Sequence, residues 1–426
     1  MTSTPRLSPF QRLLIGEGVS NFGSMLSRVV IPWLATLALA ATPFELGLLS
    51  VADVLAGAAG TVLLGATVDR ASKRAAMLYA DLARAALMAV LVALTIAHAL
   101  ALWAVVLAAA VSGLLTVTFE LARSAWMARH VPSGQLARGN AQMSVAGSIA
   151  ETLAFALGGW LYQWLGAALA LALDAFSYLA SATCVRGLAP DTATSASRHR
   201  GIGAGLVAEA RAGVRMIAAK PVLRVLATLE VLTALGTSLA ATSYMIYVAR
   251  DLALSTGILG TIFACGGAGA LAGAALAPRI GGALGHGGAI AGGLLMLALG
   301  AACIPIANGS TPLIAIALLI THQVVGDAGR AAFDVHDRTL RQTSVEMPAV
   351  ARVDAGIRTL GQVATLVGAL AGGLFANHYG ARSALVVSAT LFGVAALVAA
   401  FNSARLAGDL PRAMPGNRAL RRSRVR

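Results

Sequence analysis

The chain has 426 residues, of which 58% are hydrophobic and only 12% are charged. A soluble globular domain carries about 25% charged residues, so this composition excludes a soluble enzyme or binding module and indicates a polytopic membrane protein. The formal net charge of +14 does not indicate nucleic-acid binding, because the basic residues gather in the loops between long apolar segments.

Twelve apolar segments are each long enough to cross a bilayer, which takes about 20 residues. The residues before Leu13 are too few and too polar for a cleaved signal peptide, so we expect the first segment to be retained. The predicted spans are 13–38, 46–68, 75–97, 101–123, 141–163, 166–188, 222–248, 256–278, 286–307, 312–334, 354–377 and 381–403.

The loops between the spans alternate sharply in charge. Of the 32 Lys and Arg residues, 26 lie in loops and tails on one side, and only Arg250 and Arg382 lie in loops on the other. Since cytoplasmic loops carry the excess of Lys and Arg, both termini and the long central loop are predicted to be cytosolic. The predicted location is the bacterial plasma (inner) membrane, where the basic loops would contact anionic lipid headgroups of the bilayer.

A polar stretch at 189–221 divides the spans into two sets of six. Its second part has apolar residues at helical spacing, which indicates an amphipathic helix on the membrane surface. The expected organisation is a cytosolic N-terminus at 1–12, a six-helix bundle at 13–188, a cytosolic linker with an amphipathic helix at 189–221, a second six-helix bundle at 222–403 and a basic cytosolic tail at 404–426.

The two halves repeat at a constant offset of 214 residues. Phe119-Glu120 matches Phe333-Asp334, and Arg138-x-Asn140-Ala matches Arg352-x-Asp354-Ala. Six spans return the chain to the same side of the bilayer, so the copies are parallel repeats about an axis along the membrane normal. The predicted fold class is an all-α membrane protein with twelve transmembrane helices in two parallel six-helix repeats.

A short charged turn joins the second and third spans. It reads Gly65-Ala-Thr-Val-Asp69-Arg70-Ala-Ser-Lys73-Arg74. Gly65 allows the two helices to approach closely, and Asp69 can pair with a cation or with the positive end of a neighbouring helix. The alternative is an ordinary basic turn that only sets the topology.

With its twelve spans, parallel repeat, central linker and Gly65–Arg74 turn, the chain resembles the major facilitator superfamily over about residues 10–403. Local segments such as Asp81-Leu-Ala-Arg84 and Arg138-Gly-Asn140-Ala resemble the bacterial exporters that include siderophore and macrolide efflux carriers. The resemblance implies that spans 1, 4, 7 and 10 line a central cavity that opens to each side in turn. It also implies that the turn forms a cytosolic latch motif, with Gly65, Asp69, Arg70, Lys73 and Arg74, near the start of span 11.

One departure from that superfamily concerns the fifth span. Its proton antiporters often carry Gly-Pro there, whereas this chain has Ala154-Phe155 at that place. The direction of transport therefore stays open.

Several polar residues fall near the middle of the predicted spans, where a charge costs about 2.5–3.5 kcal/mol or more. Arg28 could pair with Asp53 or Glu151 in one state and with substrate in another, or it could form a static ion pair that fixes helix register. A desolvated carboxyl at Asp327 could take up and release a proton near neutral pH, or it could be a structural partner of Arg330. The candidates for proton coupling or substrate binding are Arg28, Asp53, Glu151, His322 and Asp327.

Charged residues also gather at the predicted inner mouth of the cavity. Glu120 and Asp334, which are equivalent in the repeat, could close a cytosolic gate by pairing with Arg123 or Arg338, or they could be plain interfacial residues. The gate candidates are Glu120, Arg123, Asp334, Arg338 and Asp354.

No enzymatic motif accompanies these residues. The chain has two lysines, Lys73 and Lys220, and neither follows a glycine, so it has no phosphate-binding loop of the Gly-x4-Gly-Lys-Ser/Thr form. Zinc-protease and nucleophile-elbow motifs are missing, and we predict no catalytic residue, no cofactor and no metal site. We expect a monomeric secondary active transporter that exports a small amphiphilic compound, such as a drug or siderophore, and is driven by the proton gradient. The alternative is a proton-coupled importer of a small metabolite or siderophore.

Overall fold

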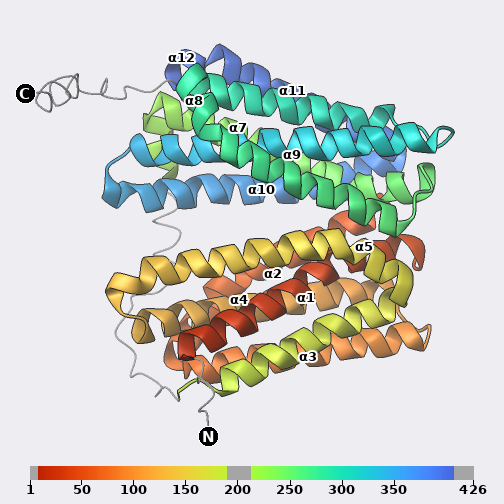
Figure 1. The fold of residues 1–426 in the computed structure, drawn as a ribbon, viewed down its shortest axis with the longest axis vertical. Coiled ribbons are helices and arrows are strands. Elements are labelled where there is room, and N and C mark those ends of the chain that lie inside the picture. The colour runs from red at the N-terminus through yellow and green to blue at the C-terminus, as the bar shows by residue number, and fades with distance from the viewer. Residues whose placement is uncertain (1–7, 190–212, 407–426) are drawn as a thin grey trace, which may run out of the picture.

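A computed structural model describes residues 8–189 and 213–406 of the chain (Figure 1). Most of the predicted linker helix and nearly all of the basic tail lie outside these residues. Within the described residues all regular secondary structure is helical. The helices are α1 (Pro9–Leu37), α2 (Pro43–Arg70), α3 (Lys73–Ile96), α4 (Leu102–His130), α5 (Ser133–Arg186), α7 (Pro221–Ile246), the π-helix η1 (Tyr247–Asp251), α8 (Thr256–Ile306), α9 (Pro312–Thr343), α10 (Met347–Tyr379), α11 (Ala381–Phe401) and α12 (Ser403–Leu406).

Two of these helices each contain two membrane crossings. Helix α5 turns back at Gly166 and α8 turns back at Gly285, where the backbone φ angles are 74° and 70°. Glycine adopts this left-handed conformation without the steric cost that a Cβ would bring. Counting α5 and α8 twice, the ten long helices of the described chain make twelve crossings, as the sequence predicts.

Each predicted span coincides with most of a helical crossing, but several helices extend beyond the predicted ends. Helix α4 continues to His130 and α9 to Thr343, although the sequence predicts that the apolar spans end at 123 and 334. Helix α10 begins at Met347 rather than 354. Apolarity marks only the part of a helix inside the bilayer, whereas the backbone hydrogen bonds of the helix continue into the polar region beyond it.

The helices form two bundles, α1–α5 and α7–α11, which lie one above the other in Figure 1. Within the first bundle α1 packs on α5, α2 on α4, and α3 on α4 and α5. In the second, α7 packs on α10 and α11, and α8 on α9 and α11, which is the same arrangement in a second copy. The bundles meet along two seams, α2 with α10 and α5 with α8.

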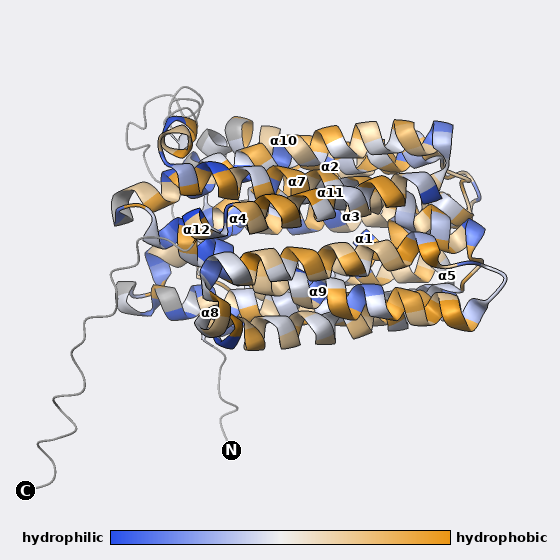
Figure 2. Ribbon diagram, turned by 90° about the horizontal axis from the view of Figure 1, so that it is seen from above, coloured by the Kyte–Doolittle hydropathy of each residue, from blue (hydrophilic) through white to orange (hydrophobic). Residues whose placement is uncertain are grey.

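Polar residues concentrate at the two ends of the bundles, and apolar residues follow the helices between them (Figure 2). One end, where α1 begins and α11 ends, carries Arg12, Arg70, Lys73, Arg129 and other cations, and we call it the basic end. The opposite end carries Arg250 and Arg382.

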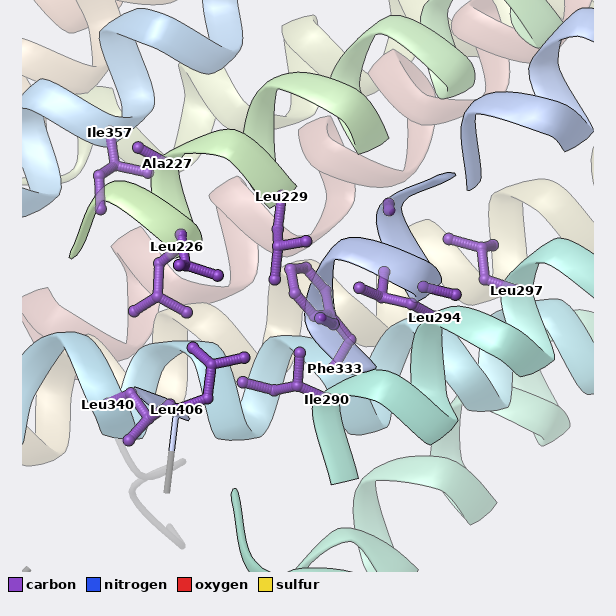
Figure 3. Packing of buried hydrophobic residues seen from close by; sticks show 14 of the residues in the cluster. Leu226, Ala227, Leu229, Ile290, Leu294, Leu297, Phe333, Leu340, Ile357 and Leu406 are labelled. Carbon is purple, nitrogen blue, oxygen red and sulfur yellow. The ribbon is translucent and has the colours of Figure 1, made fainter. Parts of the chain in front are cut away.

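The buried apolar residues form different clusters at the two ends. Towards the opposite end a single cluster draws from both bundles and includes Trp33 and Leu46 together with Tyr247 and Leu259. Towards the basic end each bundle has its own core. That of the second bundle joins α7, α8, α9 and α10 through residues such as Leu226, Leu294, Phe333 and Ile357 (Figure 3). That of the first bundle includes Leu13, Met77 and Trp126. The two bundles are therefore held together at the opposite end.

Candidate functional site

Small residues bring the bundles into direct backbone contact at the opposite end. A Cβ at Gly47 of α2 would overlap the Ala369 carbonyl oxygen of α10, and one at Gly159 of α5 would overlap the Thr256 carbonyl oxygen at the start of α8. Lipid gives little hydrophobic drive for helix association, so close packing over small residues is the main source of attraction inside a membrane. These glycines seal the two seams.

Two polar contacts reinforce the α5–α8 seam. The Trp160 Nε1 donates to Thr261 Oγ1 at 3.1 Å, and the backbone N–H of Gly257 donates to Gln163 Oε1 at 2.9 Å. Nearer the middle of the bundle, the rings of Phe155 and Phe263 meet edge to face with centroids 5.6 Å apart.

The two cations that the sequence isolates at the opposite end both cap backbone carbonyls. Arg250 of η1 donates to the carbonyl oxygens of Thr36 and Ala41 at 3.1 and 2.9 Å. Arg382 donates to the Pro305 carbonyl at 2.8 Å. Since the last carbonyls of a helix lack partners within it, both arginines satisfy exposed helix ends, but only Arg250 joins the two bundles. Sequence reasoning used Arg250 as a topology marker and missed that it joins the two bundles. The signal for this role was the presence of one arginine among loops that otherwise lack charge.

The first bundle presents an exposed ion pair. Arg28 Nη2 lies 3.6 Å from Asp53 Oδ2, and the two side chains are 59% and 42% exposed. Residues next to Arg28 on α1, such as Leu26 and Val29, are buried. The Asp53 carboxyl points towards Gly113 of α4, on the inner side of its bundle. An ion pair at this depth is tolerated where it faces water rather than lipid.

Glu151 lies on α5 between the two bundles. One turn earlier Gly147 faces Asn21 of α1, and the adjacent Thr152 lies against Gly267 of α8. The Glu151 side chain is exposed and makes no hydrogen bond or ion pair with the described residues. Its position between α1 and α8 brings a carboxylate to the same space as the Arg28–Asp53 pair.

In the second bundle a cluster of polar groups lacks partners. The Tyr244 hydroxyl of α7 and the His322 Nδ1 of α9 are buried without a hydrogen-bond partner in the described chain, and their rings lie 6.0 Å apart. The Asp327 carboxylate, also on α9, lies over Gly266 of α8, where a Cβ would overlap Oδ2. Asp327 makes no hydrogen bond or ion pair in that part of the chain either, and Gln323 lies beside it against Gly266. We call Tyr244, His322, Gln323 and Asp327 the α9 cluster.

The α9 cluster can bind a polar group or a proton. A buried polar group without a partner costs about 1–3 kcal/mol, so two in one place, beside the unpaired Asp327 carboxylate, indicate a site that a ligand or water completes. The sequence left open that Asp327 is the structural partner of Arg330. In the structure Arg330 Nε instead lies 3.0 Å from Asp334 Oδ1, one turn away on the same helix. Asp327 is thereby left without a cation.

At the basic end, ion pairs join the first and fourth crossings of each bundle. Arg123 of α4 pairs with Glu17 of α1. Arg341 of α9 lies 3.1 Å from Glu230 of α7 and 2.6 Å from Asp337.

The gate residues that the sequence proposed do not meet one another in this conformation. Arg123 forms an ion pair with Glu17, and Asp334 forms one with Arg330. Glu120 and Arg338 are exposed and have no ion-pair partner among the described residues. Sequence reasoning missed Glu17 and Glu230 as partners, although each is an acid in the third turn of its bundle's first helix.

The charged turn between α2 and α3 is compact. Ser72 caps α3, and the buried Lys73 Nζ donates to the carbonyl oxygens of Val68 and Ala71 at 2.5 and 3.2 Å. Arg74 Nη2 donates to the Arg186 carbonyl at 2.6 Å. The side chain of Asp69 lies outside the described residues. Gly65 and the exposed Arg70 belong to the end of α2, while Asp354 is half-buried near the start of α10.

No group of three His, Cys, Asp or Glu side chains is close enough to hold a metal ion in residues 8–189 and 213–406. The three cysteines, Cys184, Cys265 and Cys303, are free and half-buried.

Comparisons with known proteins agree on the fold. A search of curated sequences finds no match. The solved structure of a bacterial homologue of the iron transporter ferroportin, in an inward-facing state, superposes with a TM-score of 0.71 and 15% identity, covering 93% of this chain and 98% of the other. A mutant of the nucleoside transporter NupG gives a TM-score of 0.70 and 13% identity, covering 92% and 99%. An inward-facing bacterial homologue of the human lysosomal transporter Spinster gives 0.69 and 13%, covering 95% and 98%.

The family model described as Major Facilitator Superfamily matches residues 13–329, which is most of the chain. Together with the twelve crossings in two repeated bundles, that match makes the protein a member of the Major Facilitator Superfamily.

Proposed function

We propose that this protein is a secondary active transporter that exports a small amphiphilic compound, such as a drug or siderophore, in exchange for protons. The observation that carries the proposal is the α9 cluster, in which the carboxylate of Asp327 has no partner beside the unsatisfied Tyr244 hydroxyl and His322 ring nitrogen. A transporter needs a site near the middle of the membrane that can hold either a proton or part of its substrate.

The orientation follows from the charge at the two ends. Under the positive-inside rule the basic end faces the cytosol, so the bundles are joined on the outside and part towards the cytosol. The separate cores of the two bundles at the basic end support this inward-open assignment. In that state the compound would enter from the cytosol and meet Arg28, Asp53 and Glu151 on one side and the α9 cluster on the other.

Proton exchange would then drive the cycle. Asp327 in its ionised form attracts a cationic or hydrogen-bond-donating group of the compound, and protonation of Asp327 from the outside removes that attraction and releases it. Glu151 is the second candidate for this role, because its exposed carboxylate also lacks a partner in the described chain. The aromatic rings of Phe155, Phe263 and Tyr244 line up between the two candidates, with centroids 5.6 and 6.1 Å apart, and suit an apolar portion of the ligand.

The experiment is transport by the full-length protein in proteoliposomes, with a panel of amphiphilic compounds and a proton gradient of either direction. The Asp327→Asn variant should lose gradient-driven transport and keep counterflow exchange, because exchange needs no net proton movement. The control is Glu346→Gln, an exposed acid at the start of α10. Unchanged driven transport in Asp327→Asn would remove Asp327 from the coupling role, and the same test on Glu151→Gln would decide the second candidate.

Import is the alternative, and one observation favours it. At the place where proton antiporters of the superfamily often carry Gly-Pro, this chain has Ala154, which is fully buried, and Phe155, whose ring packs on Phe263. The two gradient directions of the same assay separate the possibilities. If the compound accumulates on the side with the higher proton concentration, it moves in exchange for protons. If it accumulates on the side with the lower proton concentration, it moves together with them.

A further inference from the structure

An apolar groove runs along the lipid-facing side of the first bundle, between α3 and the second crossing of α5. Its volume is about 450 Å³, and every residue that lines it is apolar. Phe176 and Leu179, which are 66% and 42% exposed, form one wall. The groove is lined by Leu82, Ala86 and Ala89 of α3 and by Ala172, Phe176 and Leu179 of α5.

This groove is separate from the transport pathway. Helix α3 packs mainly within its own bundle, against α4, α5 and the end of α2, and lies at the edge of the molecule farthest from the second bundle (Figure 1). At this depth no water competes for the space, and a lining without polar groups offers nothing to a polar solute. The small alanine side chains at the floor of the groove leave space for a narrow hydrocarbon chain between the larger side chains.

The two walls of the groove lead to two arginines at the basic end. Residues seven or eleven positions apart in a helix lie on the same face. Arg186 therefore lies on the same face of α5 as Leu179. By the same spacing Arg74 lies on the same face of α3 as Ala85, another lining residue. The rise of about 1.5 Å per residue puts Arg186 roughly 10 Å beyond Leu179 along the helix, towards the basic end.

The Arg74 side chain reaches the backbone of Arg186 at the basic end. Arg74 Nη2 donates to the Arg186 backbone carbonyl at 2.6 Å, so the side chain of one arginine reaches the residue that bears the other. The Arg186 side chain is exposed and has no hydrogen-bond partner in the described chain. An exposed guanidinium group at this level can bind an anion, and a phosphate accepts bidentate hydrogen bonds from arginine.

A tyrosine completes the edge of the groove. Tyr79 is 68% exposed and lies on α3 between Arg74 and Leu82. Tyrosine is enriched at the level of the lipid headgroups, where its ring is apolar and its hydroxyl is hydrated. A groove for a hydrocarbon chain, an aromatic ring at the interface and two arginines beyond it follow one another along one path.

We propose that this path is a binding site for an anionic phospholipid from the leaflet at the basic end. One acyl chain lies in the groove between α3 and α5, and the phosphate lies against the exposed Arg186 side chain, beside Arg74. Basic pockets between transmembrane helices on the cytoplasmic side bind anionic headgroups in this way. The site holds the second crossing of α5 against α3.

The test uses the purified full-length protein in detergent. Native mass spectrometry measures the bound fraction of phosphatidylglycerol and of phosphatidylcholine with the same acyl chains, and thermal unfolding is followed in parallel. Wild-type protein should bind phosphatidylglycerol at least about tenfold more tightly. Arg74→Gln/Arg186→Gln should abolish that preference and leave phosphatidylcholine binding unchanged. Ala86→Phe, which fills the groove, should weaken the binding of both lipids.

The controls separate the site from general attraction. Arg224→Gln/Arg352→Gln removes two exposed cations at the basic end of the second bundle and should keep the preference. Glycerol 3-phosphate, which carries the phosphate without acyl chains, should not raise the unfolding temperature. Equal loss of preference in both double variants would overturn the proposal, as would full binding to Ala86→Phe. If Ala86→Phe does not fold, Ala89→Leu makes the same test with a smaller side chain.

Discussion

The guanidinium group of Arg250 lies 2.9 Å from the carbonyl oxygen of Ala41, and this hydrogen bond joins the two bundles across their closed end. A second bond from the same side chain reaches Thr36 at the end of α1. Arg250 sits in a π-helical turn at the end of α7, and such turns in otherwise α-helical segments are frequent at functional sites.

We predict that Arg250→Gln opens the closed end. Hydrogen bonds to a charged group contribute about 1.5–3 kcal/mol, so their loss should raise the population with the opposite end open by about tenfold or more. Spin labels at Ala99 and Ser310, which are exposed at that end of the two bundles, should show a longer distance. The matched control is Arg382→Gln, because Arg382 caps Pro305 within its own bundle; an equal shift in this control would contradict the prediction.

The glycine seams give a second prediction. Gly159→Ala should prevent the opposite end from closing, because the added methyl group would overlap the Thr256 carbonyl oxygen of the other bundle. The spin-label distances should lengthen and transport should fall. Gly292→Ala makes the same change on α8 where a Cβ meets nothing within 4 Å, and it should leave both measurements unchanged.

The Arg28–Asp53 pair allows the functional and the static interpretations to be separated. Both side chains are well exposed, and an exposed pair contributes about 0–1 kcal/mol to stability. Arg28→Gln should therefore change the unfolding temperature by no more than a few degrees while it lowers the transport rate by about tenfold or more. A large loss of thermal stability with normal transport by the remaining folded protein would favour a pair that only fixes helix register.

The Glu17–Arg123 pair should behave in the opposite way, because Glu17 is buried. Removing one partner of a buried pair costs about 3–5 kcal/mol, since the other charge is left uncompensated, whereas replacing both is often neutral. Arg123→Gln should sharply lower the unfolding temperature, and Glu17→Gln/Arg123→Gln should restore most of it. The half-exposed Arg330–Asp334 pair provides the comparison: Arg330→Gln should cost much less than Arg123→Gln.

The sequence by itself determined the number of crossings, their positions, their repeat and the end that carries the basic charge. It could do so because backbone groups in a bilayer must be satisfied within each segment, so every long apolar stretch becomes a helix whatever surrounds it. The turns at Gly166 and Gly285 follow from the same spacing, and the alternation of basic and uncharged loops follows from the order of the helices along the chain.

Only the tertiary structure decided which charges meet. Arg123 pairs with Glu17, which is far away in sequence, and not with the nearby Glu120, and Arg330 turns to Asp334 and leaves Asp327 without a partner in the described chain. The closed end and the role of Arg250 depend equally on contacts between residues more than 200 positions apart. A charged side chain pairs with the group whose atoms come within about 3 Å of its own. The packing of the whole bundle, rather than any one segment, sets which atoms come that close.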